Sequence, residues 1–206
     1  TTVGYGRIAP VGALASFVAT FEAFLGLLGF AIATGLFYGR FSRPRAFLKF
    51  SDIAVIAPFE DGKALMFRVA PFKNNLLSEA EVTISAAIEE LVEGKLESKF
   101  YLLEPKLKKI NTFSLNWTIV HKIDSNSPFY EYTEEDFKNA DIELIIMIKA
   151  FDEVFANTVV QRTSYISPEI IYGAKFLPMY HSSKDQKTTI LDLDKINFHQ
   201  KVSIDN

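Results

Sequence analysis

The feature that most constrains this fold is an uninterrupted apolar run near the start of the chain. Residues 11–39 read VGALASFVATFEAFLGLLGFAIATGLFYG, and Glu22 is the only charged residue among them. About 20 apolar residues in a helix cross the hydrocarbon core of a bilayer. The run therefore predicts one transmembrane helix over residues 11–39.

The residues that follow the run indicate its orientation. Residues 40–50 read RFSRPRAFLKF and contain four basic residues and no acid. Basic residues just beyond a span mark its cytoplasmic end. A signal peptide fits poorly, because the apolar core is too long and the basic cluster follows it. We expect the chain in the plasma (cell inner) membrane, with residues 1–10 outside, residues 40–50 as an interface linker, and the rest in the cytoplasm.

Residues 2–6 read TVGYG and are called the filter strip below. Gly4 and Gly6 can adopt φ values closed to residues with a Cβ, and we expect a positive φ at Gly6. Successive carbonyls could then point toward a shared axis, above the Thr2 hydroxyl. In potassium channels such strips form rings of oxygens that replace the water shell of the ion. K+ would then bind at Thr2, Val3, Gly4 and Tyr5; the alternative is a surface turn with two glycines.

Longer stretches carry a family resemblance. After the filter strip and the span come YGRFSRPRAFLKFS at 38–51, FSLNWTIVHKIDSNSPFY at 113–130 and FDEVFANTVVQRTSYISPEIIYGAKF at 151–176. In this order they resemble the inward-rectifier potassium channels, the prokaryotic type most of all. The resemblance implies a homotetramer that conducts K+, with no cofactor and no enzymatic activity. It also implies an earlier span and a pore helix, so we expect an N-terminal truncation at the filter.

The pattern after Phe50 changes from helix to strand. Residues 80–85 (AEVTIS) and 141–149 (DIELIIMIK) alternate apolar and polar side chains, which is typical of half-buried strands. Turn sequences such as EDGK, DSNSP and ISPE separate the runs. Thr133 before EEDF predicts a capped short helix. Residues 51–206 are expected to form an all-β sandwich, and the resemblance implies an immunoglobulin-like one.

Four positions in the apolar run are candidates for function. An ionised group within a membrane faces protein or water, so Glu22 either supports the filter from behind or reaches the outer interface. The resemblance places Gly26 at a bend of the pore-lining helix; the alternative is close helix packing. Phe30 and Tyr38 lie about two helical turns apart. They could close a hydrophobic gate or simply contact lipid and neighbouring helices.

Two further candidate sites lie beyond the span. The basic residues of the linker are at headgroup depth and could bind anionic phospholipids or phosphoinositides, unless orientation is their only role. They are Arg40, Arg43, Arg45 and Lys49. The resemblance implies that Glu153, Ala156 and Asn157 line a cytoplasmic pore; the alternative is a solvated hairpin turn.

Composition narrows the function classes. The chain has no cysteine, so disulfide scaffolds and thiolate metal sites are excluded. Its net charge of −3 does not favour a nucleic-acid partner, and its three histidines lack metal-ligand spacing. The other hypothesis is a single-span anchor that carries a β-sandwich binding domain, with TVGYG incidental. Fourfold symmetry with inward-facing filter strips would discriminate a channel from an anchor.

Overall fold

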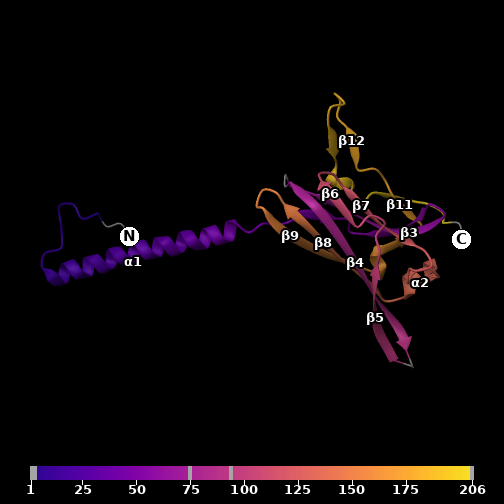
Figure 1. Ribbon diagram of the computed structural model, residues 1–206, viewed down its shortest axis with the longest axis horizontal. Coiled ribbons are helices and arrows are strands. Elements are labelled where there is room, and N and C mark those ends of the chain that lie inside the picture. Colours follow the sequence, from indigo (N-terminus) through magenta and orange to yellow (C-terminus); the bar gives the residue numbers. More distant parts are fainter. Residues whose placement is uncertain (1–3, 74–75, 93–94, 205–206) are drawn as a thin grey trace. The chain divides into compact units, whose positions relative to one another are not determined.

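The computed structural model describes residues 4–73, 76–92 and 95–204. The chain divides into two compact units, residues 1–43 and 44–206. The first unit contains the helix α1 (Ala13–Phe41), and the second, the β-domain, contains the strands (Figure 1).

Helix α1 is continuous over 29 residues and buries none of its side chains. At about 1.5 Å of rise per residue it is longer than the roughly 30 Å hydrocarbon core of a bilayer. It is the one helix among the described residues that is long and apolar enough to cross a membrane. The predicted spanning helix is therefore confirmed, although it begins and ends two residues later than residues 11–39.

The first sheet of the β-domain is built around β3, which pairs with β1, β2 and β7. Strand β10 adds to β2 in parallel, and the other pairings are antiparallel. The EDGK sequence makes the tight turn between β2 and β3, as its turn residues predict. The strands are β1 (Leu48–Phe50), β2 (Ala54–Phe59), β3 (Gly62–Pro71), β7 (Trp117–Ile123) and β10 (Ile170–Tyr172).

The second sheet has the order β5-β4-β8-β9, and β6 pairs with another part of β4. The predicted alternation is confirmed in β8, where every second residue from Ile142 to Asp152 is buried. Beyond the other strands, β4 and β5 continue as a projecting two-stranded ribbon (Figure 1). The strands are β4 (Leu77–Val92), β5 (Lys95–Leu103), β6 (Lys109–Phe113), β8 (Ile142–Asp152) and β9 (Asn157–Ile166).

The main core lies between the two sheets, which confirms the predicted β-sandwich. Phe67 of β3 and Tyr165 of β9 meet there, with their ring centroids 5.6 Å apart. The Tyr165 hydroxyl donates a hydrogen bond to the carbonyl of Ser51, at 2.8 Å. Burial raises the pKa of that hydroxyl well above its ordinary value.

The predicted short helix is also confirmed. Helix α2 (Glu134–Asn139) has Thr133 as its N-cap, and Thr133 and Asp136 form a reciprocal capping box. Helix α2 buries Phe137, which contacts the rings of Phe129 and Tyr132. The cap and this aromatic cluster together hold α2 against the β-domain.

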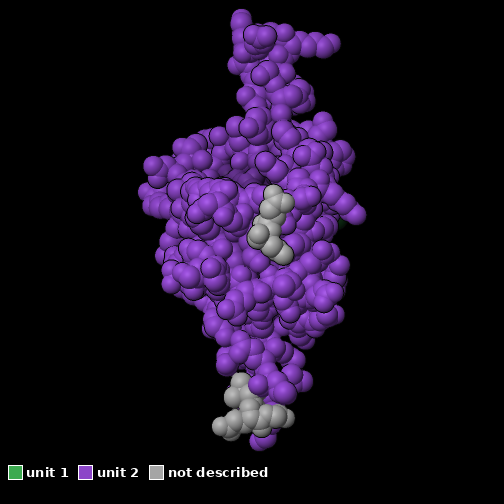
Figure 2. Space-filling view, turned by 90° about the vertical axis from the view of Figure 1, so that its right-hand side faces the viewer, with its two compact units in different colours: residues 1–43 green, residues 44–206 purple. Residues whose placement is uncertain are grey.

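The C-terminal segment covers the outer face of the first sheet. There Val55 packs with Ala174 and Phe176, and Ala70 packs with Met179 and Ile196. Figure 2 shows one face of residues 44–206 as a space-filling surface. The C-terminal segment contains β11 (Ala174–Phe176), β12 (Tyr180–Ser182), β13 (Thr189–Leu191), η2 (Leu193–Lys195) and β14 (His199–Lys201). The short helix η1 (Ser167–Glu169) precedes β10.

Candidate functional site

The structure describes the last three residues of the filter strip, and Thr2 and Val3 lie outside the described residues. Gly4 has a left-handed backbone with φ 56°. The expected positive φ at Gly6 is wrong for this chain, because positive φ among the described glycines occurs at Gly4, Gly12 and Gly173. The residue that needs glycine's freedom is therefore Gly4. An added Cβ at Gly6 would meet no atom within 4 Å.

Glu22 contacts the filter strip directly. The Tyr5 hydroxyl donates a hydrogen bond to Glu22 Oε2 at 3.2 Å, across 17 residues of sequence. Because Glu22 lies in the third turn of α1, this bond ties the extended strip back to the helix. A carboxylate is a good acceptor for a phenol. The supporting role of Glu22 stays a prediction, and this hydrogen bond is the contact that such a role would use.

The other α1 candidates differ in what surrounds them. The helix runs without a break through Gly26. Phe30 and Tyr38 are each 73% exposed, so both rings are free to meet lipid or another chain. At the helix end, the Tyr38 carbonyl accepts hydrogen bonds from the Ser42 backbone N–H and from the Ser42 hydroxyl. Phe37 and Phe41 stack beside it, with their centroids 6.4 Å apart.

The four basic candidates are divided between the two units. Arg40 lies in the last turn of α1, and Arg43 ends the first unit. Arg45 and Lys49 belong to the β-domain, where the Lys49 ammonium donates to the carbonyl of Leu193 at 3.3 Å. Lys49 is therefore partly engaged by the C-terminal segment. Arg40 and Arg43 remain as linker cations of the first unit.

A side-chain amide that the sequence did not single out connects the start of the β-domain to β9. The Leu48 N–H donates to Gln161 Oε1 at 2.9 Å, and Gln161 Nε2 donates to the Leu48 carbonyl at 2.5 Å. An amide satisfies both groups because it carries an acceptor and a donor. Gln161 thereby ties β1, the first strand after the linker, to the strand that leads from the β8–β9 hairpin.

The candidates Glu153 and Ala156 lie in the turn between β8 and β9, Asn157 is the first residue of β9, and all three are exposed. Ala156 has φ 48°, the left-handed conformation of a tight turn. Asp152 organises this hairpin and was not predicted to do so. It is 2% exposed, and its Oδ1 accepts hydrogen bonds from the N–H groups of Val154 and Phe155 at 2.9 and 3.1 Å. An aspartate directly before a turn is the sequence signal for such a cap.

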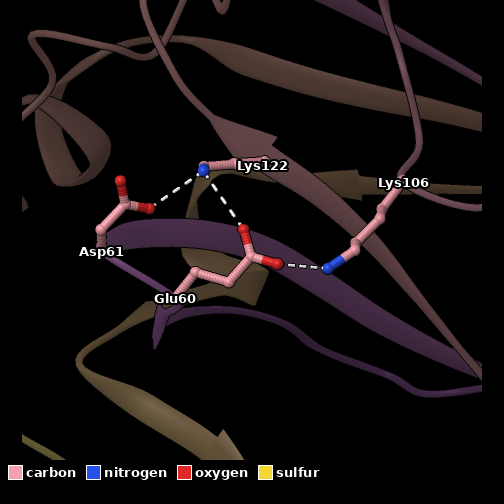
Figure 3. Close-up of polar contacts among 4 residues, drawn as sticks. All are labelled: Glu60, Asp61, Lys106 and Lys122. Atoms are coloured by element: carbon pink, nitrogen blue, oxygen red, sulfur yellow. Dashed lines mark hydrogen bonds and ion pairs between the residues drawn. The ribbon is translucent and has the colours of Figure 1, made fainter.

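A charged network connects the β2–β3 turn with β7 and with the loop between β5 and β6 (Figure 3). Lys122 Nζ contacts Glu60 Oε2 at 3.2 Å and Asp61 Oδ1 at 3.0 Å, and Lys106 also pairs with Glu60. Hydrogen bonds from these lysines lower the pKa of the Glu60 carboxyl and that of Asp61. All four side chains are exposed, so this network adds little to stability.

Within the described part of the chain, no three His, Cys, Asp or Glu side chains come together in a way that could hold a metal ion. The perturbed groups described above belong to structural hydrogen bonds rather than to a nucleophile and its base. The candidate positions therefore form two separate groups, one along α1 in the first unit and one in the β8–β9 hairpin of the β-domain.

Comparison with known proteins agrees with this architecture. Residues 48–206 match the family model described as inward rectifier potassium channel C-terminal domain. The chain is 37% identical over 200 residues to the inward rectifier potassium channel Kirbac3.1 of Paramagnetospirillum magnetotacticum. That alignment covers 97% of this chain and 67% of Kirbac3.1. These two matches show that the chain belongs to the inward rectifier potassium channel family.

Two more distant similarities were also found. The chain is 28% identical over 204 residues to the inward rectifier potassium channel irk-1 of Caenorhabditis elegans, covering 94% of this chain and 38% of irk-1. Among solved structures, the sporulation control protein Spo0M of Bacillus subtilis aligns with 60% of this chain and 49% of its own. Its TM-score of 0.30 and 7% identity give it no weight here.

Proposed function

We propose that the chain is a subunit of a homotetrameric potassium channel of the cell inner membrane, with its β-domain in the cytoplasm. The observation that carries this proposal is the order of its parts. A TVGYG strip directly precedes a helix of spanning length, and that helix leads into the domain that matches the inward rectifier family.

In this function the filter strip removes the hydration shell of K+. Carbonyls of Thr2, Val3, Gly4 and Tyr5 from four copies would replace the water oxygens around the ion. The left-handed backbone at Gly4 and the Tyr5–Glu22 hydrogen bond support the proposal, since both hold the strip in a non-regular conformation beside its helix. No covalent step and no cofactor is needed, because K+ itself is what the protein moves.

Gating is proposed at two levels. Phe30 and Tyr38 present large exposed side chains on α1, and four copies of each could close the pore by dewetting. Gly26 would provide the bend that separates open from closed helices. The β8–β9 hairpin, with Glu153, Ala156 and Asn157, would form a second constriction. Its rigid Asp152 cap supports a turn with a fixed shape.

Regulation by anionic phospholipids or phosphoinositides is proposed at Arg40, Arg43, Arg45 and Lys49. Each such cation near an anionic leaflet is worth about 1 kcal/mol of attraction. Pro44 stiffens the junction, because its ring fixes its own φ and keeps Arg43 out of the helical region. The expected effect of phosphoinositide is inhibition. An Arg43→Gln, Arg45→Gln double variant should then respond less to phosphoinositide than the parent does, in rubidium uptake by liposomes.

The proposal is tested with the full-length protein, reconstituted in liposomes. We expect potassium-selective flux. Gly4→Ala should abolish that selectivity, because a Cβ at a left-handed φ costs about 1–2 kcal/mol and displaces the carbonyl ring. Gly62→Ala is the matched control, since an added Cβ there meets no atom within 4 Å and Gly62 is not among the positive-φ glycines.

The single-span anchor is the outcome that would contradict this proposal. It predicts a purified protein without fourfold symmetry, and no difference between the Gly4→Ala and Gly62→Ala variants in any potassium measurement.

A further inference from the structure

Strands β1 and β9 lie at the edges of different sheets. Among the described strands, β1 pairs with β3 alone, and β9 pairs with β8 alone. The outer edge of such a strand presents backbone N–H and C=O groups that need partners. Gln161 of β9 provides these partners for β1, because its side-chain amide bonds both backbone groups of Leu48, at 2.9 and 2.5 Å. One side chain therefore joins the edges of the two sheets.

The chemistry of this contact requires an amide. Leu48 pairs in register with Pro71, which has no N–H to donate. The Gln161 amide supplies an acceptor for the Leu48 N–H and a donor for the Leu48 carbonyl, whereas an apolar side chain supplies neither and a carboxylate only accepts. Leu48 is 2% exposed, so its backbone groups are costly to leave without these partners.

The contact lies close to the proposed cytoplasmic constriction. Asn157, where β9 begins, is four residues before Gln161, which is about 13 Å along the strand. The Asp152 cap fixes the shape of the turn between β8 and β9. A second contact between the same segments, from the Tyr165 hydroxyl to the Ser51 carbonyl, lies farther along β9 from the turn. A displacement of β9 at Gln161 is therefore carried to the turn.

The other end of the contact continues into the linker. Leu48 is the first residue of β1, and Ala46, two residues before it, is 4% exposed. The last residues of the linker are thus packed into the β-domain, and the ring of Pro44 restricts the backbone just before them. A movement of the linker therefore acts on β1 at Leu48, where the Gln161 amide is bound.

We propose that Gln161 is a positioning residue, whose amide carries movement of the linker from β1 to β9 and so sets the opening of the β8–β9 constriction. This inference rests on the proposed channel function and adds a regulatory contact to it. Gln161 acts through β9 and the turn, and its amide contacts backbone rather than an ion. With the amide intact, the hairpin follows the linker when the channel opens. Without the amide, the hairpin does not follow, and the constriction obstructs K+.

The first test measures rubidium uptake by liposomes that contain the full-length protein. Gln161→Leu keeps a side chain of similar size and removes both hydrogen bonds to Leu48. Uptake should fall at least about fivefold, the lower end of the usual coupling between two sites. Tyr165→Phe is the matched control, because it removes the hydrogen bond to the Ser51 carbonyl. It should lower the unfolding temperature and leave uptake close to that of the parent.

Gln161→Glu gives a readout that a purely structural role would not move. The introduced carboxylate accepts from the Leu48 N–H and repels the Leu48 carbonyl, whereas its protonated form has a hydroxyl that donates to that carbonyl. A Glu carboxyl ordinarily protonates near pH 4.3, and partial burial raises that pKa. Uptake relative to the parent should therefore be low at about pH 7.5 and recover toward about pH 5. Comparison with the parent at each pH removes the titration of Asp52 and Glu169, which line the same groove.

Hydrogen exchange of the full-length protein in detergent tests the position of β9 without ion flux. Gln161→Leu should increase exchange at residues 157–160 more than Tyr165→Phe does, since Gln161 is the contact nearer to the turn. If the parent takes up no rubidium, the channel proposal fails, and exchange alone decides the role of Gln161.

The outcomes separate positioning from stability. If Gln161→Leu does not fold, Gln161→Glu at the two pH values decides the matter. With a conducting parent, three results would each overturn the proposal: unchanged uptake in Gln161→Leu, a relative uptake of Gln161→Glu that is equal at both pH values, and an equal loss of uptake in Tyr165→Phe. Unchanged exchange at residues 157–160 in Gln161→Leu would overturn it as well.

Discussion

Helix α1 and the β-domain differ in where their apolar side chains are placed. The 29 residues of α1 bury no side chain, although its sequence is almost entirely apolar. In the β-domain, every second side chain is buried along β8 and from Ala80 to Ile88 of β4, and nearly all of these buried side chains are apolar. The helix satisfies its backbone locally and leaves its side chains to lipid or to other chains. In the β-sandwich, the backbone hydrogen bonds and the burial of apolar side chains are both provided by the same chain.

The difference shows that the two regions derive their stability from different surroundings. Burial of apolar surface stabilises by about 25 cal/mol per Å², and the β-domain obtains that contribution within residues 44–206. For α1 the same contribution comes from the bilayer. This contrast can be tested with pairs of variants, in which one variant removes a contact of the β-domain and its control keeps that contact.

The largest effect is expected from deleting a core aromatic ring. Phe67 is 1% exposed, and Phe67→Ala should lower the free energy of unfolding of the β-domain by about 3–5 kcal/mol. Phe30→Ala removes the same ring from α1 and should leave that free energy unchanged. Guanidinium titration of both variants in detergent measures the difference. Equal losses would show that the two regions unfold as one unit.

Removing the Gln161 amide should have the next largest effect. Gln161→Ala leaves the N–H and the carbonyl of Leu48 without their partners, at about 1–3 kcal/mol of stability. The rate of hydrogen exchange at the Leu48 amide should increase by the factor that corresponds to this loss of free energy. Gln200→Ala, at an exposed position of β14, is the control and should change neither quantity. Slow exchange at Leu48 in Gln161→Ala would mean that β1 is held by other contacts.

A smaller effect is expected at the cap of α2. Thr133→Ala removes the N-cap hydroxyl and should destabilise the β-domain by about 1 kcal/mol. Thr133→Ser keeps the hydroxyl and should restore most of the loss. Thermal unfolding of the three proteins tests this. An equal loss in Thr133→Ser would assign the effect to the methyl group instead of the hydrogen bond.

The smallest expected effect is a loss of stability of the β-domain at acidic pH. Lysine contacts hold the pKa of Glu60 below 4.5 and that of Asp61 below 3.8, their ordinary values. Groups with a lowered pKa stabilise the folded state above the ordinary value, and that contribution is lost as pH falls through the folded-state pKa. Stability should therefore decrease slightly below pH 4.5. Lys122→Met should flatten this dependence, measured as unfolding temperature against pH, whereas the exposed Lys184→Met should not.

Local patterns predicted much of the fold because their causes are local. A long apolar run can satisfy its own hydrogen bonds only as a helix in lipid, which indicated α1. Alternation of apolar and polar residues fixed the buried faces of β4 and β8, and Thr133 marked the start of α2. The roles assigned to Gly26, Phe30 and Tyr38 stay predictions, because a gate needs side chains from several copies of the chain.

Only the tertiary structure decided the polar contacts between distant segments. The bond between Leu48 and Gln161 joins residues 113 positions apart, and neither residue type signals the other. The contact between the Arg68 guanidinium and the Phe176 ring likewise joins β3 to β11, which follows it by about a hundred residues. The sequence by itself determined the apolar helix, the buried faces of β4 and β8 and the capped start of α2, since these follow from short-range periodicity and local capping. Which polar groups meet, and which remain without a partner, depends on how the strands pair in space.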